Sequence, residues 1–261
     1  MCIRDSSASG LPELHENFGP MMAGFTHVAS GDLHALRSAV DDQTVCVLLS
    51  PWNVSVHSSP LEAEYLTGVR QICDERDLTL IVDETQLVLG GSGYALHTSA
   101  IAPVQADMVV LSAGIFAGIA GGLVVLSSTL GDAATSDVDR FPLHAALAET
   151  TLANMRERGL PASIAGNENA FAVALAQLVS RYPFIRDVQA MGRTIAMETD
   201  LDSADLLNAA DACGLRMAVS GPNGMRMQLP LEIDERDTEY ILSRLGRALE
   251  AVERMSTQFA N

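Results

Sequence analysis

The sequence contains no lysine. Lysine and arginine together number 16, and the chain has 16 arginines, so 16 minus 16 leaves none. The 33 carboxylates give a formal charge of −17. Nucleic acid and anionic membrane surfaces would repel such a chain, so we expect neither as a partner.

Cysteine is scarce, and long apolar runs are absent. Cys2, Cys46, Cys73 and Cys213 form no C-x-x-C pair, which predicts free thiols in a reducing cytoplasm. The 6 histidines lack zinc-ligand spacing, so we expect no metal site. No apolar run approaches the roughly 20 residues that a membrane-spanning helix needs.

The first residues are unlike the rest of the chain. Met1 to Ser6 lacks the basic and apolar regions of a signal peptide and resembles a translated sequencing adapter. We expect residues 1–6 to be an artefact, and the natural chain to extend further upstream. The predicted fold therefore starts at Ser7.

Helices and strands are predicted to alternate in the first half. The run 45–49 has the length and apolar character of a buried parallel strand, and 78–82, 108–112 and 123–127 repeat the signal. Asp32 to Val40 is predicted to form a short helix. A second helix should start at a capping box, with Ser59 as cap, Pro60 in the first position and Glu62 as its partner.

A second, smaller unit is predicted after the long helix 142–158, which ends at Gly159. It should contain helices 163–180, 204–213 and 234–255 and strands 193–197, 216–219 and 225–228. We expect two domains, residues 7–158 and 159–261. The predicted fold class is α/β, a mostly parallel sheet with flanking helices, followed by an α+β domain.

The run Cys73 to Gly93 resembles the acetylornithine and ornithine branch of the class III pyridoxal-phosphate aminotransferases, in which a strand ends in D-E-x-Q. The resemblance continues in order from Asn17–Phe25 through ADMVVLSAG to Gly224–Leu231. It implies a fold-type I structure, pyridoxal phosphate as cofactor, and homodimers with shared active sites. An amino-terminal region that family members carry ahead of these motifs has no counterpart here.

Three positions match the family's functional residues. The resemblance implies that Asp83 pairs with the pyridine nitrogen, that Gln86 lies near the ring hydroxyl, and that Arg226 binds the substrate carboxylate through two charge-assisted hydrogen bonds. On the residues alone, Asp83 could instead cap a turn, Gln86 could be a surface residue, and Arg226 could pair with a local carboxylate.

The chain departs from the family at the catalytic position. Ala113 stands where the resemblance places the Schiff-base lysine, and a methyl group supplies neither a nucleophile nor a general base. Val54–Val56 replaces a G-E-G loop, with Ser55 at the glutamate. Asp137 falls near the threonine that reaches the partner's cofactor phosphate, and Gly91 replaces an arginine. These losses predict a catalytically degenerate protein.

Other functions stay open at this stage. A sequence error at position 113 would leave an ordinary transaminase of ω-amino donors with 2-oxoglutarate. Alternatively, Asp83 and Arg226 could recognise an amino acid without chemistry, or the chain could act as a regulatory subunit. We expect it to form a homodimer, or a heterodimer with an active paralogue.

Overall fold

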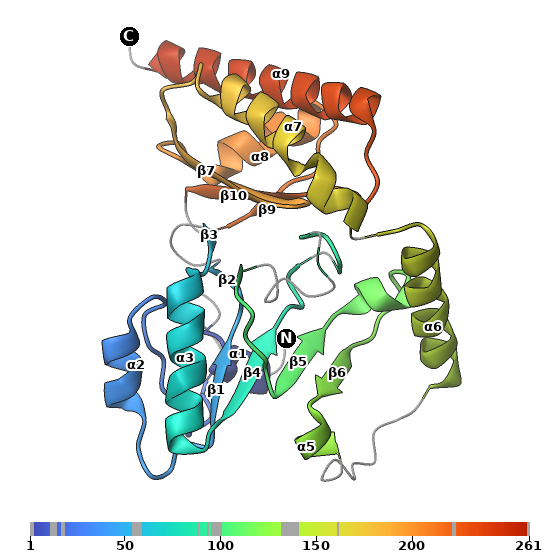
Figure 1. Ribbon diagram of the computed structural model, residues 1–261. Helices are drawn as coiled ribbons and strands as arrows, with labels where there is room; N and C mark the ends of the chain where they lie inside the picture. Colours follow the sequence, from blue (N-terminus) through green and yellow to red (C-terminus); the bar gives the residue numbers. More distant parts are fainter. Residues whose placement is uncertain are drawn as a thin grey trace.

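The computed structural model describes residues 3–10, 15–16, 19–53, 59–87, 89–92, 94, 101–131, 141–160, 162–220 and 223–259. Two separate four-stranded sheets organise this chain, one in each half of the sequence. They are stacked one above the other in Figure 1, where the amino-terminal half is below and the carboxyl-terminal half above.

The first sheet is mostly parallel, as predicted. Its strands are ordered β1-β4-β5-β6, with bounds β1 (Cys46–Leu49), β4 (Thr79–Asp83), β5 (Met108–Leu111) and β6 (Leu123–Leu126). The first three strands run parallel, and β6 is antiparallel to β5. The carboxyl ends of β4 and β5 therefore lie at the same sheet edge, where open α/β sheets place their ligands.

Two helices lie side by side against this sheet (Figure 1), α2 (Leu33–Ala39) and α3 (Ala63–Arg76). Asp32 caps α2 by accepting a hydrogen bond from the Ala35 N–H at 2.8 Å. The predicted apolar face of α3 is buried, with Leu66, Val69, Ile72 and Cys73 each at most 1% exposed. Hydrophobic burial along this face stabilises the first half.

Two local predictions in this half are wrong. Ser59 and Pro60 form β3 (Ser59–Pro60), which pairs with β2 (Trp52–Asn53), so the capping box is absent and α3 starts after Glu62. Strand β1 is an edge strand rather than a buried one, and Leu48 is 43% exposed. An apolar run alone does not distinguish an edge strand from a central one.

The second half is an antiparallel sheet covered by three helices. Its strands are ordered β7-β8-β10-β9, with bounds β7 (Ile185–Met191), β8 (Thr194–Thr199), β10 (Gly224–Gln228) and β9 (Ala218–Val219). The helices are α7 (Ala162–Val179), α8 (Ser203–Ala212) and α9 (Glu235–Phe259). This half has its own core cluster, as a separate domain would. The domain boundary at residue 159 stays a prediction.

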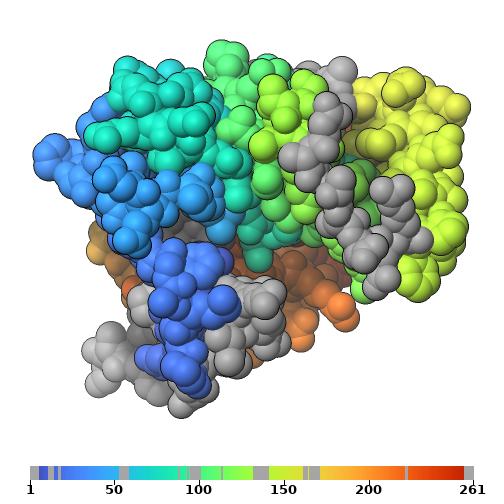
Figure 2. Space-filling model, turned by 90° about the horizontal axis from the view of Figure 1, so that it is seen from below, coloured from blue at the N-terminus to red at the C-terminus, as the bar shows by residue number. Residues whose placement is uncertain are grey.

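Short helices and one long helix complete the described chain. They are α1 (Ile3–Ala8), the 3-10 helix η2 (Ala113–Phe116), α5 (Ser128–Gly131) and α6 (Pro142–Glu157). None of the described α6 residues is buried, and the helix packs on η2. Seen from below, α6 forms one edge of the molecule, and α2 and α3 form the opposite edge (Figure 2).

A small apolar cluster and a hairpin are among the contacts between the halves. Trp52, Leu87 and Ala196 are buried together. The hairpin between β7 and β8 carries Arg193, whose backbone N–H donates to the Gly91 carbonyl at 2.6 Å. Among the described helices, none combines the length and apolar character needed to cross a membrane.

Candidate functional site

Asp83 is the last residue of β4 and lies at the carboxyl edge of the first sheet. Its Oδ1 accepts a hydrogen bond from the Thr85 backbone N–H at 2.8 Å. This is the turn-capping arrangement that the residues alone allowed. Asp83 as a whole residue is half-buried at this edge.

The structure brings Gln86 and Arg226 together across 140 residues of sequence. Arg226 Nη2, on β10, donates to Gln86 Oε1 at 3.0 Å. Gln228, two residues further along β10, donates through Nε2 to the backbone oxygen of Gln86. Because alternate residues of a strand share one face, Arg226 and Gln228 hold the same turn from the same side.

Arg226 keeps unused hydrogen-bonding capacity. Its Nε and Nη1 atoms are buried and have no hydrogen-bond partner among the described residues. Burial lowers the pKa of this guanidinium from its ordinary value, although an arginine stays charged at neutral pH. Buried donors without partners cost free energy, roughly 1–3 kcal/mol each. An anionic group placed against them would remove that cost.

Ala113 is the first residue of η2, which follows β5 after Ser112. Its backbone therefore lies next to the carboxyl edge that carries Asp83, while its side chain is outside the described part. Residues 54–58 and Asp137 are also outside the described residues, so the loop with Ser55 has no structural account. Gly91 lies in a buried turn and accepts the hydrogen bond from Arg193.

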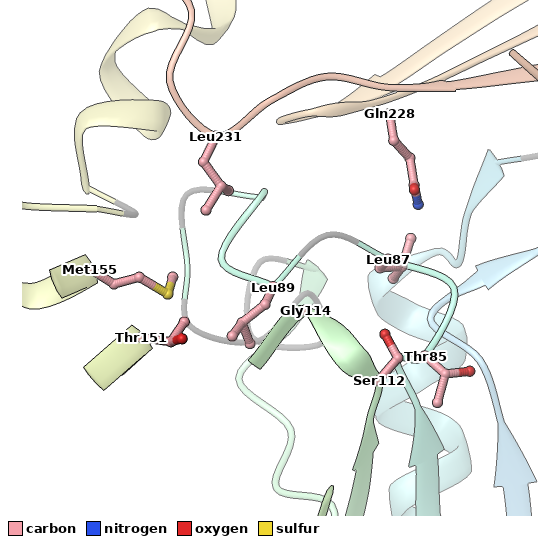
Figure 3. Close-up of a pocket in the computed structure, with 9 residues that line it drawn as sticks. All are labelled: Thr85, Leu87, Leu89, Ser112, Gly114, Thr151, Met155, Gln228 and Leu231. Carbon is pink, nitrogen blue, oxygen red and sulfur yellow. The ribbon is translucent and has the colours of Figure 1, made fainter. Parts of the chain in front are cut away.

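A cavity of about 310 Å³ lies between the carboxyl ends of β4 and β5, helix α6 and the end of β10. Figure 3 shows Thr151 and Met155 pointing into it from α6, with Gln228 and Leu231 above and the β4 and β5 turns below. Its apolar walls are Leu87, Leu89, Met155 and Leu231. Its polar groups are Thr85, Ser112, Thr151 and Gln228.

None of these cavity residues was predicted from the sequence. One signal could have identified Gln228, because it lies two residues after Arg226 in a predicted strand and must share its face. No comparable signal exists for Thr151 and Met155, since α6 reaches the cavity only through the packing of the chain.

The sequence profile of the family aminotransferase class-III matches residues 6–249. The chain belongs to the class-III aminotransferases. Among curated relatives of this family, acetylornithine aminotransferase 1 from Pseudomonas syringae pv. tomato is 29% identical over 252 residues, which cover 93% of this chain and 62% of the relative. The acetylornithine/succinyldiaminopimelate aminotransferase of Yersinia pestis is 29% identical over 255 residues, which cover 94% of this chain and 63% of that protein.

Solved structures show the same fold. The ornithine aminotransferase from Toxoplasma gondii ME49 superposes with a TM-score of 0.87 at 23% identity, covering 97% of this chain and 63% of that one. A transaminase from the marine bacterium Virgibacillus gives a TM-score of 0.87 at 18% identity, and the match covers 98% of this chain and 66% of that one. The predicted fold-type I class-III architecture is confirmed. The chain spans less than two thirds of the length of the curated relatives described above.

Proposed function

We propose that this class-III aminotransferase-family protein binds an amino acid through Arg226 and does not carry out transamination. The observation that carries the proposal is the pair of buried, unpartnered donors on Arg226 in a chain that has no lysine. The arginine provides recognition of a carboxylate, whereas no primary amine is available on any side chain for covalent catalysis.

The residues present do not fit a covalently held pyridoxal phosphate, the cofactor that the family uses. Position 113 is alanine, and no lysine elsewhere in the chain could replace it. Asp83 Oδ1 is engaged with the Thr85 backbone, and Gln86 Oε1 is engaged with Arg226. The missing lysine is what rules out the covalent bond, since one accepted hydrogen bond leaves each of these side chains further polar atoms.

Asp83 completes the proposed site as the partner of the ligand's α-ammonium group. It is a half-buried residue at the sheet edge where β4 ends, three residues before Gln86 in sequence. A zwitterionic amino acid then meets a cation at Arg226 and an anion at Asp83.

Calorimetry with a neutral amino acid tests the proposed recognition. Replacing Arg226 with alanine should weaken binding by about 30-fold or more, which corresponds to the roughly 2 kcal/mol or more lost with a buried bidentate contact. The matched control is Arg247→Ala, because Arg247 is an exposed arginine on α9 and its loss changes the net charge equally. An equal effect of the two variants, or no heat in the unaltered protein with either neutral or charged amino acids, contradicts the proposal.

Chemical trapping tests the proposed loss of covalent catalysis. The protein is mixed with pyridoxal phosphate, reduced with borohydride and digested, and the modified peptides are identified by mass spectrometry. We expect no modified side chain in the protein as it stands. The Ala113→Lys variant tests whether the pocket can still place pyridoxal phosphate beside position 113. A label at position 113 in this variant, with none in the unaltered protein, fits the proposal.

Transamination is the second candidate function. It is favoured by the family match and by the names of the relatives, which are acetylornithine aminotransferases. In that case the donor would be an ω-amino compound and the acceptor 2-oxoglutarate. Resequencing the gene decides between the candidates, because a lysine codon at position 113 would restore the missing amine.

We further propose a cytoplasmic location and pairing with a second copy. Cys46, Cys73 and Cys213 are free thiols, which fits a reducing compartment. Phe141 and Leu143, at the start of α6, are 62% and 56% exposed, and a second copy would cover them. Light scattering of the purified protein should give twice the chain mass. A complex that forms only with a lysine-bearing paralogue would replace the homodimer with a heterodimer.

A further inference from the structure

We infer that the amino acid bound at Arg226 has an uncharged side chain, which is received by the cavity between β4, β5, α6 and β10. This inference rests on the proposed function, because it takes binding at Arg226 as given. It adds the chemical class of the ligand. The argument depends on where the cavity lies relative to Arg226 and on the groups that form its walls.

Gln228 joins the cavity to the arginine. Arg226 and Gln228 are two residues apart on one face of β10, a separation of roughly 6.5–7 Å. Both donate to Gln86, and Gln228 also lines the cavity. On this inference, a ligand whose carboxylate meets Arg226 extends its side chain past Gln228 towards α6, where Thr151 and Met155 point into the cavity (Figure 3).

The walls offer hydrogen bonds and apolar surface but no charge. Leucine and methionine side chains form the apolar part, and two threonines, a serine and a glutamine form the polar part. Among the described residues that line the cavity, none is acidic or basic. An ammonium or carboxylate moved from water into such a space loses hydration without gaining a counter-ion.

The size and the chemistry together favour a small neutral side chain. At about 310 Å³ the cavity is at the lower end of the roughly 300–1,000 Å³ typical of small-molecule sites. Apolar atoms of the ligand would contact Leu87, Leu89 and Met155. A ligand hydroxyl or amide, if present, could bond to Thr85 or Ser112. The relatives named above act on acetylornithine and related compounds by their names, so this preference would separate the chain from them.

Norvaline and ornithine provide a matched pair of probes. They share the same α-carbon and three-carbon side chain, and ornithine adds a terminal amine that is protonated at neutral pH. In calorimetry with the full chain, we expect norvaline to bind and ornithine to bind at least about tenfold more weakly. Equal affinity, or a preference for ornithine, overturns the inference.

A charge placed in the cavity wall should reduce or remove this preference. Thr151→Glu introduces a carboxylate at the cavity, and Ala153→Glu introduces the same charge on an exposed part of the same helix. We expect Thr151→Glu to tighten ornithine binding by about tenfold or more and Ala153→Glu to change it by about twofold at most. The same small change in both variants would show that the side chain lies elsewhere and would overturn the inference.

The Arg226→Ala variant separates the two proposals. If norvaline binding is lost in that variant but ornithine binds the unaltered protein equally well, only the inferred ligand class is wrong. If norvaline binds with equal affinity with and without the arginine, or neither norvaline nor ornithine binds the unaltered protein, the proposed function is wrong and so is the inferred ligand class. If ornithine alone binds, and its binding needs the arginine, only the ligand class is wrong.

Discussion

The close approach of two turns predicts a large difference between two glycine substitutions. Gly192 and Gly159 both have left-handed backbone angles, with φ of 59° and 67°. A Cβ at Gly192 would overlap the Gly91 carbonyl oxygen and would lie 2.6 Å from Ser92 Cα. A Cβ at Gly159 would meet nothing within 4 Å. The two positions thus share the backbone strain and differ in the space around them.

The expected free energies follow from these surroundings. Gly159→Ala should lower the free energy of unfolding by about 1–2 kcal/mol, the cost of a left-handed alanine. Gly192→Ala carries the same cost and also displaces the hairpin, which breaks the hydrogen bond from Arg193 to Gly91 and leaves buried groups without partners. This adds about 1–3 kcal/mol, giving about 2–5 kcal/mol in all.

Urea unfolding measures both variants under the same conditions. Trp52 is the single tryptophan of the chain, is 1% exposed and lies in the cluster between the two halves, so its fluorescence reports on this interface. The two variants should therefore differ in their transition midpoints. Equal losses of stability would refute the close packing of the hairpin on the Gly91 turn.

Three further predictions concern single side chains. Burial raises the pKa of Asp107, but hydrogen bonds from a backbone N–H and from Arg70 outweigh it and leave the pKa below its ordinary value. Because the folded-state pKa is lowered, the ionised carboxylate stabilises the protein above the unfolded-state pKa, and this stabilisation is lost as the pH falls through the folded-state pKa. Asp107→Asn should therefore lower the unfolding free energy by about 1–2 kcal/mol at pH 7 and by less below about pH 4. Urea titrations at both pH values measure the difference. Gln228→Leu removes the hydrogen bond to Gln86 and should lower the unfolding free energy by about 1 kcal/mol in the same assay, and no change would show that this contact contributes nothing. Burial raises the pKa of the Cys73 thiol to about 11, and its side chain is fully buried, so alkylation at pH 8 followed by peptide mapping should label Cys73 only after unfolding.

Much of the first half could be predicted because its signals are local. The buried face of α3 follows from the helical spacing of Leu66, Val69 and Ile72. A short helix was predicted over 32–40, and the structure has it over Leu33–Ala39 with Asp32 as its N-cap. The strand that ends at Asp83 follows from one apolar run. Such features depend on residues a few positions apart, which the sequence displays directly.

Strand β7 was missed because its pattern is irregular. It contains Arg186 and Asp187 near its start, and the register shifts between Ile185 and Asp187, which interrupts the alternation that identifies a strand. Ser59 and Pro60 show the opposite case, a regular local pattern that gives a wrong prediction, here a helix start. Their local pattern fits a capping box, but pairing with β2 placed them in a strand.

The sequence by itself determined the family resemblance, the alternation of helices and strands, and the chemistry that is missing. A chain without lysine has no side-chain amine, whatever its fold. Only the tertiary structure decided that Gln86 meets Arg226, that Gln228 borders a cavity, and that α6 closes its side. These contacts join residues far apart in sequence, and they depend on how the two sheets pack rather than on any local preference of the chain.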